Sequence, residues 1–99
     1  DNFVSPLHLA VNKNNKKAVK KLLKAGSDVD CAGEFEQTPL HLATISGDLK
    51  MIKLLLKYHA DIKLVDEKNL SVIDYAIDEK NVKIINYLKK QIYKKEEKI

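Results

Sequence analysis

The chain has no arginine, only one cysteine and no long apolar run, and each absence argues against a class of protein. A single cysteine cannot build an intramolecular disulfide framework, so an intracellular, reducing setting, cytoplasmic or nuclear, is expected. No stretch approaches the roughly 18 to 20 apolar residues of a membrane-spanning helix, and no segment resembles a signal peptide. Specific recognition of phosphates and base edges usually uses the arginine fork, so the all-lysine composition weakens a nucleic-acid-binding function.

One six-residue motif occurs three times at a constant interval. It is SPLHLA at 5–10 and TPLHLA at 38–43, and it recurs with several substitutions as SVIDYA at 71–76. Both intervals are 33 residues, with no insertion between the copies. A fixed period of this size is typical of a stacked solenoid and not of a globular fold closed on itself. Such arrays hold partners more often than they catalyse reactions.

The chain resembles the ankyrin repeat family, whose unit of about 33 residues carries a Thr-Pro-Leu-His-x-Ala signature. The copies that begin at Ser5 and Thr38 match this signature at every fixed position, if serine is allowed for threonine. The likeness continues through GDLKMIKLLL at 47–56 and KAGSDVD at 24–30, and it covers essentially all 99 residues. The resemblance implies an all-α repeat solenoid in which each unit is a helix-turn-helix followed by a β-hairpin loop.

The repeats make residues 1–99 a single expected ankyrin repeat domain. Repeat one is expected at 5–37, repeat two at 38–70 and a capping repeat at 71–90, with a basic tail or fraying helix at 91–99. Lys89 occupies the position of the apolar Leu56 one period earlier. Burying this lysine in an internal repeat would cost free energy, whereas a last repeat exposes its outer face to water. Because the chain opens inside a hairpin sequence without an initiator methionine, we expect a fragment of a longer protein that is monomeric in isolation.

Each well-preserved copy carries the residues that start and stop a helix. Ser5 and Thr38 are preferred N-caps, and the proline after each takes the first helical position, where a missing N–H costs nothing. Asn14 and Gly47 are expected to end the first helices because both adopt the left-handed conformation readily. The second helix of repeat two is expected at about 49–58. The apolar positions of the second helices predict the core, at Val19, Leu22, Leu23, Ile52, Leu55 and Leu56.

The residues that could suggest an enzyme or a metal site have simpler interpretations. His8 and His41 lie inside the repeated signature with no ligand cluster near them, and the resemblance implies that they tie a helix to adjacent loop backbone. Cys31 lacks a partnering base, and its counterpart Leu64 indicates a small apolar filler. The sequence also lacks a glycine-rich phosphate loop and paired carboxylates. We therefore expect no enzyme activity, no cofactor and no metal.

Charged residues follow the same period and predict two oppositely charged surfaces. Because packed helices lie about 8 to 10 Å apart, rows of lysine on the second helices should make the convex surface strongly positive. These rows are Lys17, Lys50 and Lys83; Lys20, Lys53 and Asn86; and Lys24, Lys57 and Lys90. The opposite, concave surface is expected to be acidic, with Glu34, Glu36, Asp66, Glu67, Asp78 and Glu79 against Lys13 and Lys68. The net charge of +4 conceals this separation.

Ankyrin arrays typically bind through the concave side, formed by the hairpins and the first helices, and the resemblance implies that variable positions there contact a partner. These positions are Glu34, Phe35, Gln37, Ile45, Ser46, Glu67, Lys68, Leu70, Asp78 and Glu79. Phe35, Ile45 and Leu70 are apolar where the fold predicts exposure, which is typical of a hot spot ringed by charge. Phe35 could instead fold back on its own hairpin, where Glu36 replaces the family's usual turn glycine, and Leu70 could serve packing.

The sequence leaves three functions open. The leading hypothesis is a protein–protein interaction scaffold whose acidic concave face holds a basic or amphipathic segment, or a folded domain, of another protein. A second is electrostatic docking of the convex lysine face onto nucleic acid, an anionic membrane or another polyanion. Nucleic acid is disfavoured because no aromatic side chains are interleaved with the lysines for base stacking. A third is the targeting module of a larger enzyme, channel or ubiquitin-ligase adaptor.

Overall fold

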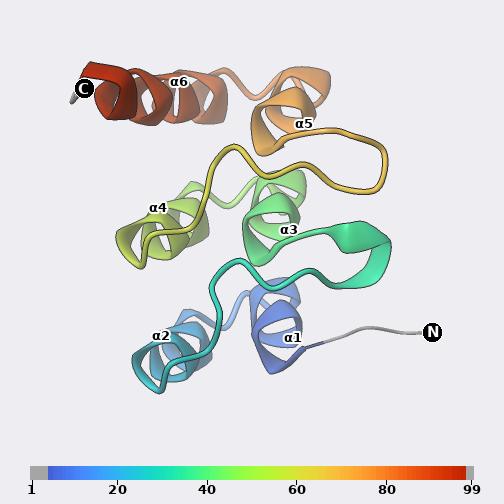
Figure 1. The fold of residues 1–99 in the computed structure, drawn as a ribbon, viewed down its shortest axis with the longest axis vertical. Helices are drawn as coiled ribbons and strands as arrows, with labels where there is room; N and C mark the ends of the chain where they lie inside the picture. The colour runs from blue at the N-terminus through green and yellow to red at the C-terminus, as the bar shows by residue number, and fades with distance from the viewer. Residues whose placement is uncertain (1–4, 98–99) are drawn as a thin grey trace.

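The computed structural model describes residues 5–97, which form six α-helices and one short 3₁₀ helix and contain no strand. The helices come in pairs, which are α1 (Pro6–Asn12) with α2 (Lys16–Lys24), α3 (Pro39–Ser46) with α4 (Leu49–Lys57), and α5 (Val72–Asp78) with α6 (Val82–Glu97). Figure 1 shows the pairs stacked in line, with α1, α3 and α5 in one column and α2, α4 and α6 in the other. The described chain is thus an all-α solenoid.

The helices start where side chains can satisfy the free N–H groups of the first turn. The Ser5 hydroxyl accepts from the N–H of His8 at 3.1 Å, and the Thr38 hydroxyl accepts from the N–H of His41 at 3.3 Å. Pro6 and Pro39 follow these caps, as the sequence predicts. The second helices have their own row of caps one period apart, in which Asn15, Asp48 and Asn81 accept from the N–H three residues later.

The turn inside each helix pair contains one residue in the left-handed conformation. The φ angles are 55° at Asn14, 74° at Gly47 and 57° at Lys80, so the expectations for the first two residues are confirmed. Glycine takes this conformation freely, whereas a residue with a Cβ pays roughly 1 to 2 kcal/mol for it. The third pair therefore keeps the turn geometry at a cost, because the stacking position of α6 depends on it.

One continuous core runs between the two columns of helices and through all three pairs. Its centre is in repeat two, where Leu40, Ala43, Ile52 and Leu55 are fully buried. The first and last pairs supply the rest, including Leu7, Val11, Val19, Val72, Ala76, Ile84 and Leu88. Most of the predicted core positions are confirmed, because apolar residues one period apart are brought into contact by stacking.

Two predicted core residues are only half-buried, one in the outer repeat and one near the end of a helix of the central pair. Leu22 is half-buried because it lines an open cleft on the side of repeat one that faces away from repeat two. Leu56 is half-buried near the end of α4, so it is a peripheral residue. Its counterpart Lys89 is exposed.

The expected β-hairpin loops are tight turns closed by few hydrogen bonds, too short to form strands within residues 5–97. The N–H of Gly33 donates to the carbonyl of Gln37 at 2.9 Å, and the N–H of Asp66 donates to the carbonyl of Leu70 at 3.0 Å. Successive loops are joined because the N–H of Glu67 donates to the carbonyl of Phe35 at 2.9 Å. The loops therefore stack like the helices.

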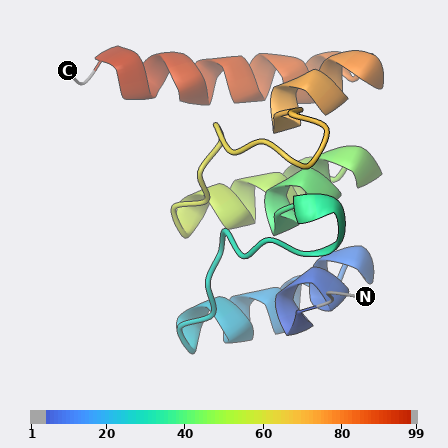
Figure 2. The same cartoon turned by 45° about the vertical axis from the view of Figure 1, so that its right-hand side comes forward.

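The last helix is longer than the repeat requires. α6 continues without a break past residue 90 to Glu97, so most of the expected basic tail is helical. Figure 2 shows α6 extending beyond the ends of α2 and α4. Ile92 packs partly against the core, which gives the extension a contact that a free tail would lack. Residues 98–99 of the expected tail lie outside the described residues.

Candidate binding surfaces

Two histidines hold the loops that carry the predicted concave-face residues. Nε2 of His41 lies 2.9 Å from the carbonyl of Leu70, and Nε2 of His8 lies 2.8 Å from the carbonyl of Gln37. The N–H of Thr38 donates to Nδ1 of His41 at 3.2 Å, so Nε2 carries the proton and donates to Leu70. Each histidine thus ties a first helix to the loop backbone at the end of its own repeat, in agreement with the tie to adjacent loop backbone that the family resemblance implies.

Asp74 replaces the signature histidine in the third copy, and among the described residues its side chain makes only the helix-capping contacts. Its carboxylate accepts from the N–H of Ser71 at 2.8 Å and from the Ser71 hydroxyl at 3.1 Å. This preserves the cap of α5.

A small cleft, called here the hairpin cleft, opens between the two hairpin loops. It has a volume of about 300 Å³ and is lined by Phe35, Gln37, Asp66, Lys68 and Tyr75. Three of these residues were predicted as binding residues from the sequence, and Tyr75 was not. Tyr75 takes the place of Leu9 and Leu42 in the earlier copies. This change from an apolar residue to one with a hydroxyl group is the sequence feature that could have indicated Tyr75 as a site residue.

Asp66 lies at the floor of the hairpin cleft and is only 6% exposed, so its assignment to the acidic surface was wrong. Its carboxylate accepts from the Tyr75 hydroxyl, from Nε2 of Gln37 at 3.4 Å, and from the backbone N–H groups of Lys68 at 2.9 Å and Leu70 at 3.1 Å. Burial raises the pKa of Asp66, but these hydrogen bonds outweigh burial and lower the pKa to about 2. The hydrogen bond to Asp66 and burial raise the pKa of Tyr75.

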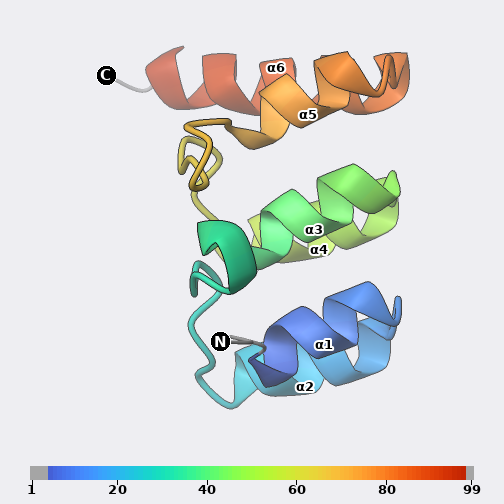
Figure 3. The same ribbon diagram turned by 90° about the vertical axis from the view of Figure 1, so that its right-hand side faces the viewer.

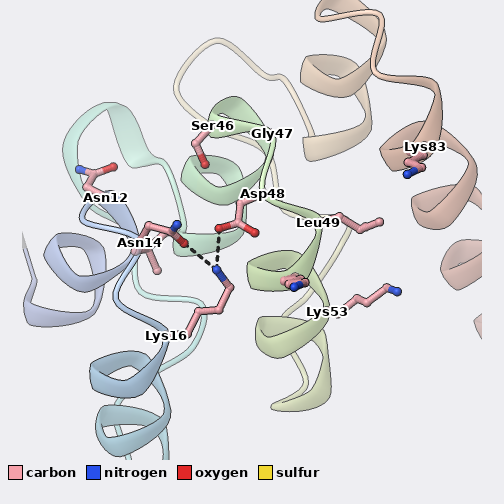
Figure 4. A pocket seen from close by; sticks show the side chains of 11 residues that line it. Asn12, Asn14, Lys16, Ser46, Gly47, Asp48, Leu49, Lys53 and Lys83 are labelled. Atoms are coloured by element: carbon pink, nitrogen blue, oxygen red, sulfur yellow. Dashed lines mark hydrogen bonds and ion pairs between the residues drawn. The ribbon is translucent and has the colours of Figure 1, made fainter.

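A larger cleft, called here the lysine cleft, lies where the helices of each pair turn. Its volume is about 650 Å³, and Figure 4 shows side chains from all three pairs around it. Lys16 donates to Asp48 at 3.0 Å and to Asn14 at 2.7 Å, and Lys16 and Asp48 form the one ion pair among the described side chains. Burial raises the pKa of Asp48, but hydrogen bonds from Lys16 and the Met51 N–H more than offset this and lower it. The cleft also contains Lys50, Lys53 and Lys83.

Comparison with protein families agrees with this architecture. A model described as ankyrin repeats, in three copies, matches residues 7–98. The chain belongs to the ankyrin repeat family. Ankyrin repeats are generally protein–protein interaction modules and are typically not catalytic. Comparison with curated proteins found no match to this chain. No helix in residues 5–97 of this ankyrin array has the length and apolar character needed to cross a membrane.

The ankyrin fold separates the predicted binding residues into two groups. One group surrounds the hairpin loops and consists of Glu34, Phe35, Gln37, Glu67, Lys68 and Leu70, whereas Ile45, Ser46, Asp78 and Glu79 lie at the far ends of α3 and α5. Phe35 is 57% exposed and Ile45 is 38% exposed. Leu70 is half-buried and its carbonyl accepts from both His41 and the N–H of Asp66, which agrees with the packing alternative given for it and not with full exposure.

Ser46 lies beside lysines and apart from the predicted binding residues of the hairpin loops. It lines the lysine cleft together with Lys50 and Lys83. Its hydroxyl donates to the carbonyl of Ala43 at 3.0 Å, which closes the end of α3. The two lysines of one predicted row thus share a cleft, as expected for residues one period apart in an ankyrin stack.

Acid should weaken this ankyrin array through Asp66. Because its folded pKa of about 2 lies below the unfolded value of about 3.9, the ionised carboxylate contributes its full stabilisation above pH 4 and loses it as the pH falls through 2. We expect Tyr75→Phe to lower the free energy of unfolding by about 1 to 2 kcal/mol at pH 7, and by less than half of that at pH 2. Urea unfolding across this range measures both values.

The exposed Tyr93 on α6 provides the matched control for this prediction. Tyr93→Phe removes the same hydroxyl from a side chain that is 60% exposed, so its effect should be close to zero at every pH. A Tyr75→Phe effect that is equally large at pH 7 and pH 2 would show that the charge on Asp66 is not involved.

Proposed function

We propose that this ankyrin array holds a basic or amphipathic segment of another protein against its hairpin loops. The contact surface, called here the hairpin face, consists of Glu34, Phe35, Glu36, Glu67 and Lys68 around the hairpin cleft. The observation that carries the proposal is the large exposed ring of Phe35 at the mouth of a cleft flanked by three exposed carboxylates. An apolar anchor within a rim of charge is typical of a binding hot spot.

The backbone around Phe35 supports this role because it is held in a costly conformation. Phe35 and Glu36 both have φ of 57°, in a region that bulky residues rarely occupy. The carbonyl of Phe35 accepts from the N–H of Glu67, and the side chain of Gln37 reaches Asp66 and the Tyr75 hydroxyl. Such strain persists where the surrounding structure enforces it, and it is concentrated at functional sites. A fixed loop also reduces the ordering entropy that binding must overcome.

The electrostatic part of the proposal depends on the exposed carboxylates and not on Asp66. Glu34, Glu36 and Glu67 are exposed, whereas Asp66 already accepts four hydrogen bonds. A basic segment would therefore be attracted by the rim and anchored by Phe35. Charge of this kind mainly raises the association rate, and the apolar anchor mainly lowers the dissociation rate.

A peptide selection tests this function without knowledge of the natural partner. Random 16-residue peptides displayed on phage are selected against the immobilised chain, and we expect the selected peptides to be rich in lysine or arginine and in large apolar residues. For the tightest synthetic peptide, Phe35→Ala should weaken binding by about 30-fold, since a hot-spot residue contributes about 2 kcal/mol or more. The double variant Glu34→Lys, Glu67→Lys should mainly slow association, as surface plasmon resonance would show.

Val82 on α6 is the control for the anchor because it is an exposed apolar residue outside the hairpin face. Val82→Ala should leave the peptide affinity within twofold of the parent value. If the selected peptides show no basic or apolar preference, or if they bind Phe35→Ala and the parent chain equally, the hairpin face is not the binding surface.

A further inference from the structure

We propose that the lysine cleft binds a compact anion that carries two or more phosphate groups. This site lies apart from the hairpin face. Figure 3 shows the turns between paired helices on one side of the stack, at the right, and the hairpin loops on the opposite side, at the left. The inference therefore goes beyond the proposed function and does not depend on it.

The charge inside the cleft favours an anion. Four lysines line it, and the single carboxylate there, Asp48, is already paired with Lys16. The remaining ammonium groups, on Lys50, Lys53 and Lys83, have no carboxylate within ion-pair distance among the described side chains. They come from two different helix pairs, so only the stacked fold brings these like charges together. A cleft lined by one sign of charge raises the local concentration of the opposite ion.

The position of these lysines at helix N-termini adds to the positive charge. α2, α4 and α6 all begin on this side of the stack, and none has an acidic residue in its first turn. Lys16 and Lys17, Lys50, and Lys83 occupy those first turns instead. The N-terminus of a helix carries partial positive charge and favours anions, so it repels the ammonium group of a lysine in the first turn. A bound anion would relieve the repulsion between the side chains and also that between the side chains and the helix ends.

One of the lysines is held in place by an aromatic ring. The ammonium group of Lys53 lies 5.2 Å from the centre of the Tyr87 ring, which belongs to the neighbouring pair. A cation–π contact orients the side chain without neutralising its charge. The same contact occupies one face of the Tyr87 ring, and no aromatic side chain lines the described cleft for a nucleic-acid base to stack on. The cleft is therefore better suited to phosphate groups than to bases.

The size of the cleft indicates a compact ligand. Its volume of about 650 Å³ lies within the range of about 300 to 1,000 Å³ that is usual for small-molecule sites. Three unpaired ammonium groups call for a similar negative charge in this space, and each phosphate monoester contributes about −1.5 to −2 at pH 7. Two or more phosphates meet that requirement, whereas the single charge of a carboxylate does not. Lysine serves as a point-charge partner for phosphate oxygens.

Tripolyphosphate is the probe, and isothermal titration calorimetry at two salt concentrations, about 50 mM and about 150 mM, is the measurement. We expect one molecule to bind per chain, at least about tenfold more tightly than inorganic phosphate, with weaker binding at the higher salt. The double variant Lys50→Gln, Lys83→Gln should lose about tenfold or more in affinity. Without ligand its melting temperature should equal or exceed that of the parent chain, because the helix ends lose unfavourable charge.

The matched control removes the same number of charges from another lysine row. Lys24 and Lys57 are exposed residues at the C-terminal ends of α2 and α4, outside the lysine cleft. Lys24→Gln, Lys57→Gln should change the affinity for tripolyphosphate by less than threefold. Equal losses in the two double variants, or several probe molecules bound per chain, would overturn the proposal in favour of diffuse charge attraction.

Two competing ligands complete the test. A 12-nucleotide thymidine oligomer and vesicles containing phosphatidylserine present the same phosphate chemistry on an extended polymer and on a surface. We expect both to bind more weakly than tripolyphosphate. Tighter binding of either, weakened as much by Lys24→Gln, Lys57→Gln as by Lys50→Gln, Lys83→Gln, would replace the compact site with an extended docking surface.

Discussion

Leu55→Ala is expected to lower the free energy of unfolding by about 2 to 5 kcal/mol, the usual range for a buried leucine truncated to alanine. Leu55 is fully buried in α4, the second helix of the central pair. Helix pairs pack on both sides of it, so neither neighbour can close the resulting cavity without disturbing its own contacts. An array of only 99 residues has little stability in reserve, and this one substitution should remove a large share of it.

Leu22 provides the matched control because it occupies the same position one period earlier. It is half-buried beside an open cleft on the outer side of repeat one. Leu22→Ala should therefore cost less than half as much as Leu55→Ala. Urea unfolding followed by circular dichroism measures both values, and equal losses would mean that stacking on both sides of α4 adds nothing to the burial of Leu55.

His41→Ala is expected to lower the free energy of unfolding by about 2 to 4 kcal/mol, since it combines a core cavity with an unpaired buried N–H. His41 is fully buried, and its ring accepts from the N–H of Thr38 and donates to the carbonyl of Leu70. Leu70 keeps its bond from the N–H of Asp66, but the N–H of Thr38 loses its partner. The rings of His41 and Tyr75 also pack edge to face, with their centroids 5.9 Å apart, so loss of the His41 ring should loosen the hairpin cleft.

Asp74 tests whether this cost comes from the long-range tie or from the helix cap. Asp74→Ala removes the same signature position from the third copy, where the side chain only caps α5 and is exposed. It should cost about 1 kcal/mol or less. Hydrogen exchange adds a specific readout, since the amide of Thr38 should lose protection in His41→Ala and keep it in Asp74→Ala. Similar costs for the two variants would contradict a structural tie through His41.

The core and the two candidate sites occupy different parts of one stack. The core and the histidine ties place the loops, and the loops place Phe35 at the mouth of the hairpin cleft. The turns on the opposite side of the stack place Lys50 and Lys83 in the lysine cleft. A variant that loosens the central pair should therefore weaken both sites, whereas the binding variants named above should leave the fold intact.

Much of the fold could be predicted from residue order alone, because the signals are local. The proline after Ser5 or Thr38 marks a helix start, Gly47 marks a helix end, and apolar residues at helical spacing mark the core. The constant period then places equivalent residues side by side, and this is why the sequence predicts Lys50 and Lys83 on one surface. These inferences need only nearest-neighbour chemistry and the rule that repeats stack in line.

The candidate sites could be predicted less well, because burial and pairing depend on segments distant in the chain. Asp66 looks like any loop carboxylate in the sequence, but it is buried in the fold, where Tyr75 and Gln37 from other parts of the chain lie beside it. Leu70 is half-buried because His41 binds its carbonyl from 29 residues away. The repeat period and the helix caps could thus be predicted from the sequence, because they depend only on residues close together in the chain. The clefts and their free charges were decided by tertiary packing, which alone brings side chains of separate repeats within contact distance.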